Sequence, residues 1–511
     1  MSLDLSIANA LSGLKVVQRS IDTVSQNITN AQTPGYTRKT LAQSAVVIGQ
    51  TGAGVQVGEL QRVVDASLQA DLRRRTGALA GQEIKEAYLQ RVEELQGRPE
   101  DEQSLASTYG RVQDAFEKLS TSPESVSYQL EVVNEANALT EQLRSMSSQM
   151  LTLRNQTQVE IGASVETING NLRRISDLNN EIIAVSQRGE STAHLEDQRD
   201  QSVLELSKYM DIQTVKSNDQ RIIITTRSGL TLVDRSAQQL EFSQTTLDHN
   251  SYYSASPPGN IPGITLKSAP GRDITSALSG DGKLGALLEL RDRTFPTLQG
   301  QLDEFAQKLA MRFEAAGMTL FTGSPGTYPA QPTKPGSPVP ADIPGNYVGF
   351  AADIHVNPAA TNPDFVRYGD AGAPAAGAPA VTNQRILNVL NYAMGDSADV
   401  TGLPHAAFRN SALGPNPLGN LTSDLPQVAS LGSFVQTLVA RQGQMRADVT
   451  AEKTRTEELK NAVETRSNDL SGVNLDTEMA QLTILQRSYS ASAQVLRTAQ
   501  QMMDTLFSAV R

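Results

Sequence analysis

The sequence predicts a mainly α-helical protein with a β-containing domain inserted in its middle. Stretches at both ends of the chain repeat apolar residues at spacings of three and four, as amphipathic helices do. Short β-prone runs separated by turn residues begin near residue 211. The chain has 511 residues, which is too long for a single core, so we expect several domains.

The last stretch, residues 473–511, predicts one long helix with a seam of apolar side chains. Apolar residues recur every seven positions, and others fill the half-steps between them. Such a repeat is typical of helices that pair as coiled coils. The predicted C-terminal assembly seam consists of Leu475, Leu482, Leu485, Tyr489, Leu496, Met503, Leu506 and Val510.

The first stretch, residues 3–31, carries the matching pattern, with polar residues outside the stripe. Two helices at opposite ends of a chain can cover their apolar stripes by pairing. Both stripes are poor in large apolar side chains, so we expect the pair to be weak alone and to gain from packing among copies of the chain. This points to a polymer subunit. The predicted N-terminal assembly seam consists of Ile7, Leu14, Val17, Ile21, Val24 and Ile28.

The first helix is expected to end near Thr33-Pro34-Gly35, because a residue before proline is driven out of helical geometry and glycine permits a turn. Two β-prone runs follow, at 36–48 and 55–64, and predict a hairpin or a pair of extended arms. The runs could form a contact surface toward neighbouring subunits or be an ordinary hairpin.

Further helices are expected at 65–97, 102–120 and 193–210. Between them, Ser122-Pro123-Glu124 has the residue types of a helix start, and the helix should extend to Arg188. Gly162 and Gly170 lie inside this helix and predict a bend.

The second half of the chain alternates between helical and loop-like composition. Residues 283–317 predict a helix that is broken or kinked at Pro296. The proline-rich and glycine-rich stretches 322–346 and 369–380 are expected to be surface loops, with a small packed segment between them. A short helix is expected at 381–394, and a longer one from Leu425 to a break at Ser471-Gly472.

These elements predict three domains. Residues 1–35 and 473–511 form a terminal coiled-coil domain, which would be the axial core of an assembly. Residues 36–210, 283–320 and 381–472 form a long-helix bundle that includes the N-terminal hairpin. Residues 211–282 form an outer insertion rich in strands and loops, and an extension of this insertion to residues 321–380 stays open.

Composition excludes several classes of protein. The net charge of −11 argues against a nucleic-acid binder, which normally shows a basic patch or stripe. The chain has no cysteine, which excludes disulfides, thiol catalysis and thiolate-bound metals. No apolar run approaches the ~20 residues of a membrane span, and the first residues lack the features of a signal peptide.

The sequence shows no motif for catalysis. None of the four histidines has another histidine or a cysteine at metal-ligand spacing. The run Asp281-Gly282-Lys283 lacks the spacing of a phosphate-binding loop, and a G-x-S-x-G nucleophile elbow is missing. We assign the charged group Asp197, Arg199 and Asp200 to structural ion pairing. We therefore expect no catalytic residue, no cofactor and no metal.

Four stretches carry a resemblance to a known family. Residues 27–38, NITNAQTPGYTR, and the ending SGVNLDTEMAQLTILQRSYSASAQVLRTAQQMMDTLF resemble the terminal motifs of bacterial flagellar rod, hook and hook-associated proteins. Residues 195–212 and 282–317 resemble the hook-associated proteins of the hook–filament junction in particular. The motif residues in this chain are Asn27, Asn30, Pro34, Gly35 and Tyr36.

The resemblance implies a structural subunit that joins hook to filament through its terminal helices. Its implied partners are the hook protein, another hook-associated junction protein, copies of itself in a ring or helical tube, and an export chaperone on the C-terminal helix. It also implies export through the flagellum's own channel without a cleaved signal, to an extracellular site. Two alternatives stay open: another axial subunit of the hook or distal rod, and a secreted enzyme or adhesin carried on flagellar-type ends.

Overall fold

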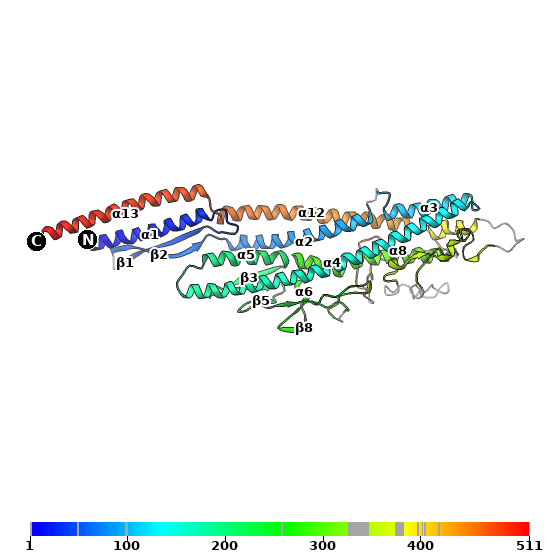
Figure 1. The fold of residues 1–511 in the computed structure, drawn as a ribbon, viewed down its shortest axis with the longest axis horizontal. Coiled ribbons are helices and arrows are strands. Elements are labelled where there is room, and N and C mark those ends of the chain that lie inside the picture. Colours follow the sequence, from blue (N-terminus) through cyan, green and yellow to red (C-terminus); the bar gives the residue numbers. More distant parts are fainter. Residues whose placement is uncertain are drawn as a thin grey trace. The chain divides into compact units, whose positions relative to one another are not determined.

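The computed structural model describes residues 3–48, 51–97, 101–256, 259–324, 347–373, 383–395, 398–400, 402, 405–416 and 419–509. Contacts divide the chain into two compact units. Unit 1 comprises Met1–Leu79, Thr167–Gln239 and Arg455–Arg511, and unit 2 comprises Ala80–Glu166 and Leu240–Thr454. Figure 1 traces these elements, and the predicted mainly α-helical fold with inserted β elements is confirmed.

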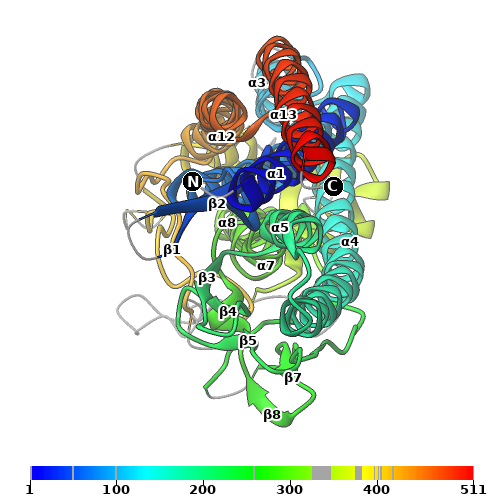
Figure 2. The same cartoon turned by 90° about the vertical axis from the view of Figure 1, so that its left-hand side faces the viewer.

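The two ends of the chain pair within unit 1. Helix α1 (Leu3–Thr29) packs along helix α13 (Leu475–Ala509), and Figures 1 and 2 show the two side by side. Asn27, near the end of α1, bonds Glu478, near the start of α13, so the two helices run antiparallel. The predicted pairing of the terminal helices is present in the single chain.

A β-hairpin covers another part of α1. Strands β1 (Lys39–Ile48) and β2 (Thr51–Arg62) pair antiparallel, and both contact α1. The predicted hairpin is confirmed. Its first residue pair joins Lys39 to Arg62, which places these two side chains beside the end of α1.

The rest of unit 1 is built around α5 (Ala193–Tyr209) and a three-stranded antiparallel sheet in the order β3-β4-β5. The strands span Ile212–Lys216, Ile222–Thr226 and Thr231–Val233, as expected from the β-prone runs. Asn179 holds this sheet, since its side chain bonds both the N–H of Ile222 at 3.0 Å and its carbonyl at 2.9 Å. Arg199 of α5 donates to the same Asn179 at 3.1 Å.

Unit 2 has an aromatic core around α8 (Phe295–Ala315). Phe305 is fully buried, meets Tyr109 of α3 (Leu105–Thr121) edge to face, and stacks on Phe434. Phe408 also stacks on Phe434, with the two ring centroids 3.7 Å apart. Segments that are far apart in the sequence therefore share one aromatic core.

Pro296 is accommodated by a π-helical turn. Helix α7 (Lys283–Glu289) continues into the π turn η1 (Leu290–Thr294) and then into α8. A proline inside an α-helix lacks its N–H and clashes with the carbonyl four residues earlier. The wider turn places Pro296 in the first turn of a new α-helical segment, where neither problem arises. The predicted break is thus present, as a change of helix type.

Three long helices contribute to both units: α2 (Ala66–Gln96), α4 (Val126–Gln187) and α12 (Leu431–Ser471). Helix α4 continues through Gly162 and Gly170 without a break, and a bend at these glycines stays a prediction.

The predicted starts of two helices were wrong. Ser122 does not cap α4, because residues 122–125 form a turn in which the N–H of Ser125 donates to the carbonyl of Ser122 at 3.0 Å. Helix α12 begins at Leu431 and not at Leu425, because Leu425 precedes a proline, which disfavours helical geometry. The predicted end at Ser471 is confirmed.

The remaining elements of unit 2 are short. They are β6 (Leu240–Glu241), β7 (Thr265–Leu266), β8 (Ala269–Asp273), α6 (Thr275–Leu278), β9 (Phe321–Thr322), α9 (Phe350–Asp353), β10 (His355–Val356), η4 (Pro358–Thr361), α10 (Phe365–Tyr368), η5 (Gly369–Ala371), α11 (Gln384–Asn388) and η6 (Val389–Ala393). The segment 347–371 is packed as expected, since Phe350 and Val366 are buried. The proline-rich stretch 325–346 and residues 374–382 lie outside the described residues.

The three predicted domains do not coincide with the two units. The hairpin, which was expected in the bundle domain, lies in unit 1 with the terminal helices, and so does the β3-β4-β5 sheet. The division into an axial core, a bundle and an outer insertion therefore stays a prediction.

Candidate functional site

Asn27 ties three segments of unit 1 together. It lies in the last turns of α1 with 1% of its surface exposed. Its amide nitrogen donates to the carbonyl of Lys39 at 2.9 Å and to Oε2 of Glu478 at 3.0 Å. Its amide oxygen accepts from the N–H of Lys39 at 3.1 Å and from the hydroxyl of Tyr36 at 3.0 Å. Both N–H groups and the oxygen are used, so the position is specific for an asparagine.

Glu478 anchors the start of α13 in the same place. Its side chain is buried, and Oε1 accepts from Nε of Arg38 at 2.7 Å. The backbone N–H of Arg38 also donates to the carbonyl of Ser471, the last residue of α12, at 2.7 Å. Asn474 caps α13 by accepting the N–H of Asp476 at 3.0 Å. The turn after α1 therefore holds the junction between α12 and α13.

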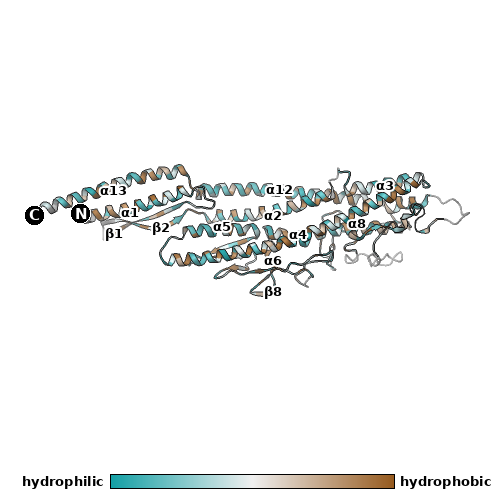
Figure 3. Cartoon of the chain, in the orientation of Figure 1, coloured by the Kyte–Doolittle hydropathy of each residue, from teal (hydrophilic) through white to brown (hydrophobic). Residues whose placement is uncertain are grey.

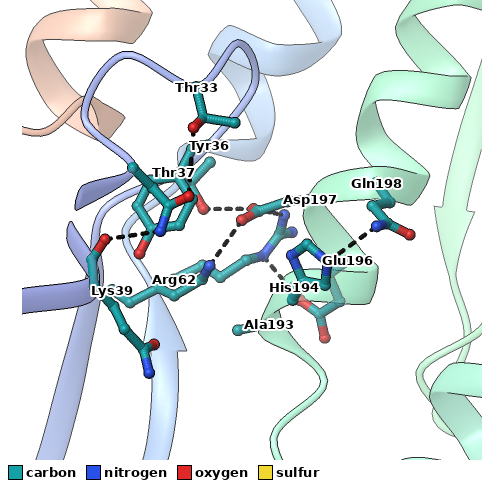
Figure 4. A network of polar contacts seen from close by, with 12 residues as sticks. Thr33, Tyr36, Thr37, Lys39, Arg62, Ala193, His194, Glu196, Asp197 and Gln198 are labelled. Carbon is teal, nitrogen blue, oxygen red and sulfur yellow. Dashed lines mark hydrogen bonds and ion pairs between the residues drawn. The ribbon is translucent and has the colours of Figure 1, made fainter. Parts of the chain in front are cut away.

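Lys39 connects the turn after α1 to helix α5. Its ammonium lies 3.9 Å from the centre of the Tyr36 ring and 3.2 Å from Oδ2 of Asp197. The other oxygen of Asp197 accepts from Thr37 at 2.6 Å and from Arg62 at 2.9 Å. Figure 4 shows Thr37 and Arg62 reaching Asp197 from two directions.

Arg62 pairs with three carboxylates of α5, at 2.9 Å from Glu196, 2.9 Å from Asp197 and 2.8 Å from Asp200. Burial disfavours its charged form, but the three carboxylates outweigh burial and raise the pKa of Arg62 above its ordinary value. Burial, followed by the charges of Asp197 and Glu478, also raises the pKa of Tyr36 to about 12. The phenol therefore stays protonated and can donate to Asn27.

We call this set the polar junction: Asn27, Tyr36, Thr37, Arg38, Lys39, Arg62, Glu196, Asp197, Asp200 and Glu478. It contains a residue from each of three stretches that carried the family resemblance, at 27–38, 195–212 and the C-terminal end. The ion pairing expected of Asp197 and Asp200 is present. Arg199 instead donates to Asn179 and to the carbonyl of Gln220 at 2.9 Å.

The remaining motif residues lie beside the polar junction. Asn30 donates to the carbonyl of Gln26 within its own helix turn at 2.9 Å. Pro34 and Gly35 are exposed, and Gly35 has a φ of 74°, where a side chain would be strained. Arg38 lies in the motif stretch 27–38 but was not selected as a site residue, and Lys39, Arg62 and Glu478 were missed. The sequence did hold one sign that Glu478 is buried. It lies four residues before Leu482, so it is on the same helix face as the apolar seam.

The N-terminal seam residues lie along α1 with graded burial. Val24 is buried, and Ile7, Leu14, Val17, Ile21 and Ile28 are half-buried. Val16, which was not assigned to the seam, is buried as well.

Only some of the residues predicted for the C-terminal seam are buried or half-buried. Leu482, Leu485, Leu496 and Met503 are half-buried, whereas Leu475 is 45% exposed and Tyr489 is 39% exposed. Among the described side chains of α13, Glu478 and Ala499 are the buried ones. The stripe that faces α1 runs through 478, 482, 485, 496, 499 and 503, so Leu475 and Tyr489 lie at its margin. The side chains of Leu506 and Val510 lie outside the described residues.

A second apolar stripe on α13 faces away from this pair. Ile484 is 63% exposed, Val495 is 53% exposed and Met502 is 58% exposed. Together with exposed Ala491 they recur at spacings of seven, four and seven, which keeps them on one helix face. Figure 3 shows hydrophobic positions spaced along α13. Helix α13 is thus apolar on two faces, of which α1 covers one.

Outside the polar junction, the described part of the chain has a buried carboxyl group but no cluster of metal-ligating side chains. Among these residues there is no cluster of three or more His, Asp or Glu side chains suited to a metal. No helix of the described residues has both the length and the hydropathy needed to cross a membrane. In unit 2, Asp303 is fully buried and accepts the N–H groups of Gly349 at 2.8 Å and Ala351 at 2.9 Å. Burial raises its pKa to about 7.

The chain is similar in sequence to known flagellar proteins. The family model "Flagellar hook-associated protein FlgK helical domain" matches residues 89–328, and "Flagellar basal body rod FlgEFG protein C-terminal" matches residues 469–509. Flagellar hook-associated protein 1 of Escherichia coli is 25% identical, over 98% of both chains. Its counterpart in Salmonella typhimurium is 27% identical, over 98% of this chain and 99% of that one. Over almost its full length, this chain is similar to flagellar hook-associated protein 1.

More distant relatives share the family name. The hook-associated protein 1 of Bacillus subtilis is 21% identical over 98% of this chain and 97% of its own. The solved flagellar hook junction protein FlgK of Burkholderia pseudomallei is 21% identical, with a TM-score of 0.42, and the match covers 50% of this chain and 46% of that one. A hook-associated protein 1 is a structural component of the bacterial flagellum, so the polar junction belongs to a structural subunit.

Proposed function

We propose that this hook-associated protein joins the hook to the filament and assembles through α1 and α13. The observation that carries the proposal is the construction of unit 1 at the chain ends. The polar junction fixes the start of α13 against the end of α1, with Asn27 and Glu478 both buried. Beyond that fixed point α13 presents its second apolar stripe to solvent.

In this proposal the second stripe is a contact between copies. Ile484, Val495 and Met502 lie on one helix face. Packing this face against another helix would remove these apolar side chains from water, which favours association. The α1–α13 pair of one chain would lie against the pairs of its neighbours in a ring or helical tube. The half-buried seam residues would become fully buried in the same step.

The finer assignments follow from this role. The hook protein would contact one side of the assembled ring. Another hook-associated junction protein would contact the other side. An export chaperone would cover the apolar α13 before export, which would proceed without a cleaved signal to an extracellular position at the junction. The protein would act as a structural part and not as an enzyme.

A complementation experiment tests the proposal. A strain lacking the protein receives the full chain, a chain without residues 473–511, or a chain with Leu482→Asp or Ile484→Asp. Gln486→Asp, on an exposed position of the same helix, is the matched control. We expect bare hooks and flagellin shed into the medium with the truncation, with Leu482→Asp and with Ile484→Asp, and normal filaments with the full chain and the control.

The two substitutions separate folding from assembly. Leu482 is half-buried against α1, so Leu482→Asp weakens the pair itself, whereas Ile484 is 63% exposed and Ile484→Asp should leave the single chain intact. Normal filaments with Ile484→Asp would reject the second stripe as a contact between copies.

The two alternatives have separate readouts. If hooks themselves are missing in the deletion strain, the protein is a hook or distal-rod subunit, and immunogold labelling would decorate more than a narrow band. If filaments form normally without the protein, a secreted enzyme or adhesin becomes the better assignment.

A further inference from the structure

A pocket in unit 1 lies beside the polar junction. It has a volume of about 190 Å³, and its walls come from the turn 35–37, from α2, from α5 and from the end of α12. Tyr36, Leu72 and Leu204 line it, and each is half-buried, so a molecule from outside can reach them. An apolar cavity of about 150 Å³ can hold benzene, so this pocket is large enough for one branched aliphatic side chain.

Most charged groups of this pocket already have partners within the chain. Asp197 and Asp200 both pair with Arg62, at 2.9 Å and 2.8 Å. Arg73 donates to the hydroxyl of Thr214 at 3.0 Å and is attracted by the charge of Asp200. These groups therefore offer little net charge to a visiting side chain.

Glu464 of α12 also lines the pocket, and its charge is more available. Its side chain is 43% exposed, and its ion pair is with Lys460, four residues earlier on the same helix. Exposed pairs of this kind contribute little, because water screens both charges. The carboxylate of Glu464 can therefore accept a second cation. The pocket combines half-buried apolar walls with one exposed acidic group.

The second apolar stripe of α13 carries the complementary groups. Ile484 is 63% exposed, and Arg487 lies three residues later on the same helix face. Arg487 is exposed and forms no ion pair with the residues that the structure describes. Val495 has no such neighbour, because Arg497 is two residues away and lies on another face. Met502 has no cation within four residues, so Ile484 is the stripe residue that fits the pocket best.

We propose that the pocket of one copy of the chain receives Ile484 of a neighbouring copy, with Arg487 of that copy beside Glu464. The inference rests on the proposed function, in which copies pack through α13, and it names the surface that the second stripe binds. Pocket and stripe are different surfaces of the chain, so each copy binds one neighbour by its pocket and another by its stripe. Such a head-to-tail contact builds a ring or a helical tube.

Disulfide crosslinking between copies tests this contact. The chain has no cysteine, so any disulfide between copies must use the introduced residues. One full-length chain carries Gln201→Cys, on an exposed position that lines the pocket, and a second carries Ile484→Cys. A strain lacking the protein expresses both chains with different tags, and its flagella are oxidised and analysed on non-reducing gels. We expect mixed dimers of the two chains.

Two matched controls move one cysteine at a time. Arg227→Cys lies on an exposed turn of unit 1 that does not line the pocket, and it replaces Gln201→Cys. Gln486→Cys lies on an exposed position of α13 two residues from Ile484, and it replaces Ile484→Cys. We expect no mixed dimers from either control pair.

Exchange of the two charges tests the same contact without cysteines. Glu464→Arg and Arg487→Glu should each lower the share of hooks that carry filaments, because each places like charges together between copies. The double variant restores an opposite pair between copies, so we expect filaments to return. Rescue by the double variant would also show that neither single change acts by unfolding the chain.

Three outcomes would overturn the proposal. They are the absence of mixed dimers from flagella that carry filaments, dimers of Ile484→Cys with itself in place of mixed dimers, and a double charge variant that stays without filaments. If Ile484→Asp still blocks filaments in these cases, copies pack through the stripe but not into the pocket. Normal filaments with Ile484→Asp would reject the stripe contact itself.

Discussion

The aromatic core around α8 and the α1–α13 pair use opposite kinds of packing. Along α8, Phe295, Phe305 and Phe313 are at most 1% exposed, and each meets another ring edge to face. Along α13 the buried residues, among the side chains that the structure describes, are Glu478 and Ala499, and large apolar side chains face solvent. The core of unit 2 is complete within one chain. The pair in unit 1 is positioned by buried polar groups and leaves apolar surface for other molecules.

The difference shows what each region is built for. Apolar burial stabilises without fixing one arrangement, whereas a buried hydrogen-bonded network tolerates few alternatives. The polar junction therefore defines the geometry of the chain ends, while the core of unit 2 supplies stability. Four predictions test this contrast, from the largest expected effect to the smallest.

Phe305→Ala should cost the most. Removing a fully buried ring that contacts Tyr109 and Phe434 leaves a cavity, so we expect a loss of about 3 to 5 kcal/mol in the free energy of unfolding. Urea unfolding would measure it. Val159→Ala, at a position that is 55% exposed in the same unit, should change the value by less than about 0.5 kcal/mol. A similar small loss for both variants would disprove the contrast.

Asn27→Ala should destabilise the chain ends without affecting unit 2. It removes hydrogen bonds to Lys39, Tyr36 and Glu478 and leaves buried groups unpaired, so we expect about 2 to 3 kcal/mol of lost protection. Hydrogen exchange of the backbone amides in α1 would report it. Asn30→Ala is the control from the same motif, since Asn30 donates within its own helix turn. Equal effects at the two asparagines would mean that the polar junction does not fix the chain ends.

Asp303 should make stability depend on pH. Its pKa is raised from 3.8 to about 7 in the folded protein, so between those values the folded state holds a proton that the unfolded state releases. Stability contributed by this group therefore falls as pH rises from about 4 to about 7, by at most about 1.4 kcal/mol per pH unit.

Urea unfolding across that pH range should show a shallower decline for Asp303→Asn than for wild type. Asp114→Asn, at an exposed carboxylate of the same unit, is the control and should keep the wild-type slope. Identical slopes in Asp303→Asn and wild type would show that the buried carboxyl is not responsible.

Ile484→Asp should have the smallest effect on the isolated chain. The side chain is 63% exposed, so hydrogen exchange in α13 should change by less than about 0.5 kcal/mol. A marked loss of protection would show that Ile484 packs within its own chain, and the second stripe would then not be available to neighbours.

Much of the fold could be predicted because its signals are local. Spacings of three and four identified α1 and α13, alternation and turn residues identified β1 to β5, and the break at Ser471-Gly472 separated α12 from α13. Starts of helices were harder, as at Ser122 and Leu425, because a turn or a proline within a few residues decided the boundary.

The partners inside the site could not be predicted. Asn27 was selected as part of a motif, but its contact with Glu478 joins residues 451 positions apart. Likewise, Asp197 was expected to form ion pairs, but its partners Lys39 and Arg62 lie on the hairpin far earlier in the chain. The spacing of apolar residues along the sequence does not indicate which distant charged residue the fold will place beside a given side chain.

The sequence by itself determined that the two chain ends are amphipathic helices, that strands interrupt the helical middle, and that the family motifs lie at the ends. These properties depend on each residue and its near neighbours. Only the tertiary structure decided that Glu478 and not Leu475 is buried against α1, and that α13 keeps a second exposed apolar stripe. Which residues of α13 are buried depends on the face that α13 turns toward α1. Asn27 favours the face that carries Glu478, because it forms hydrogen bonds with Glu478 and with Lys39.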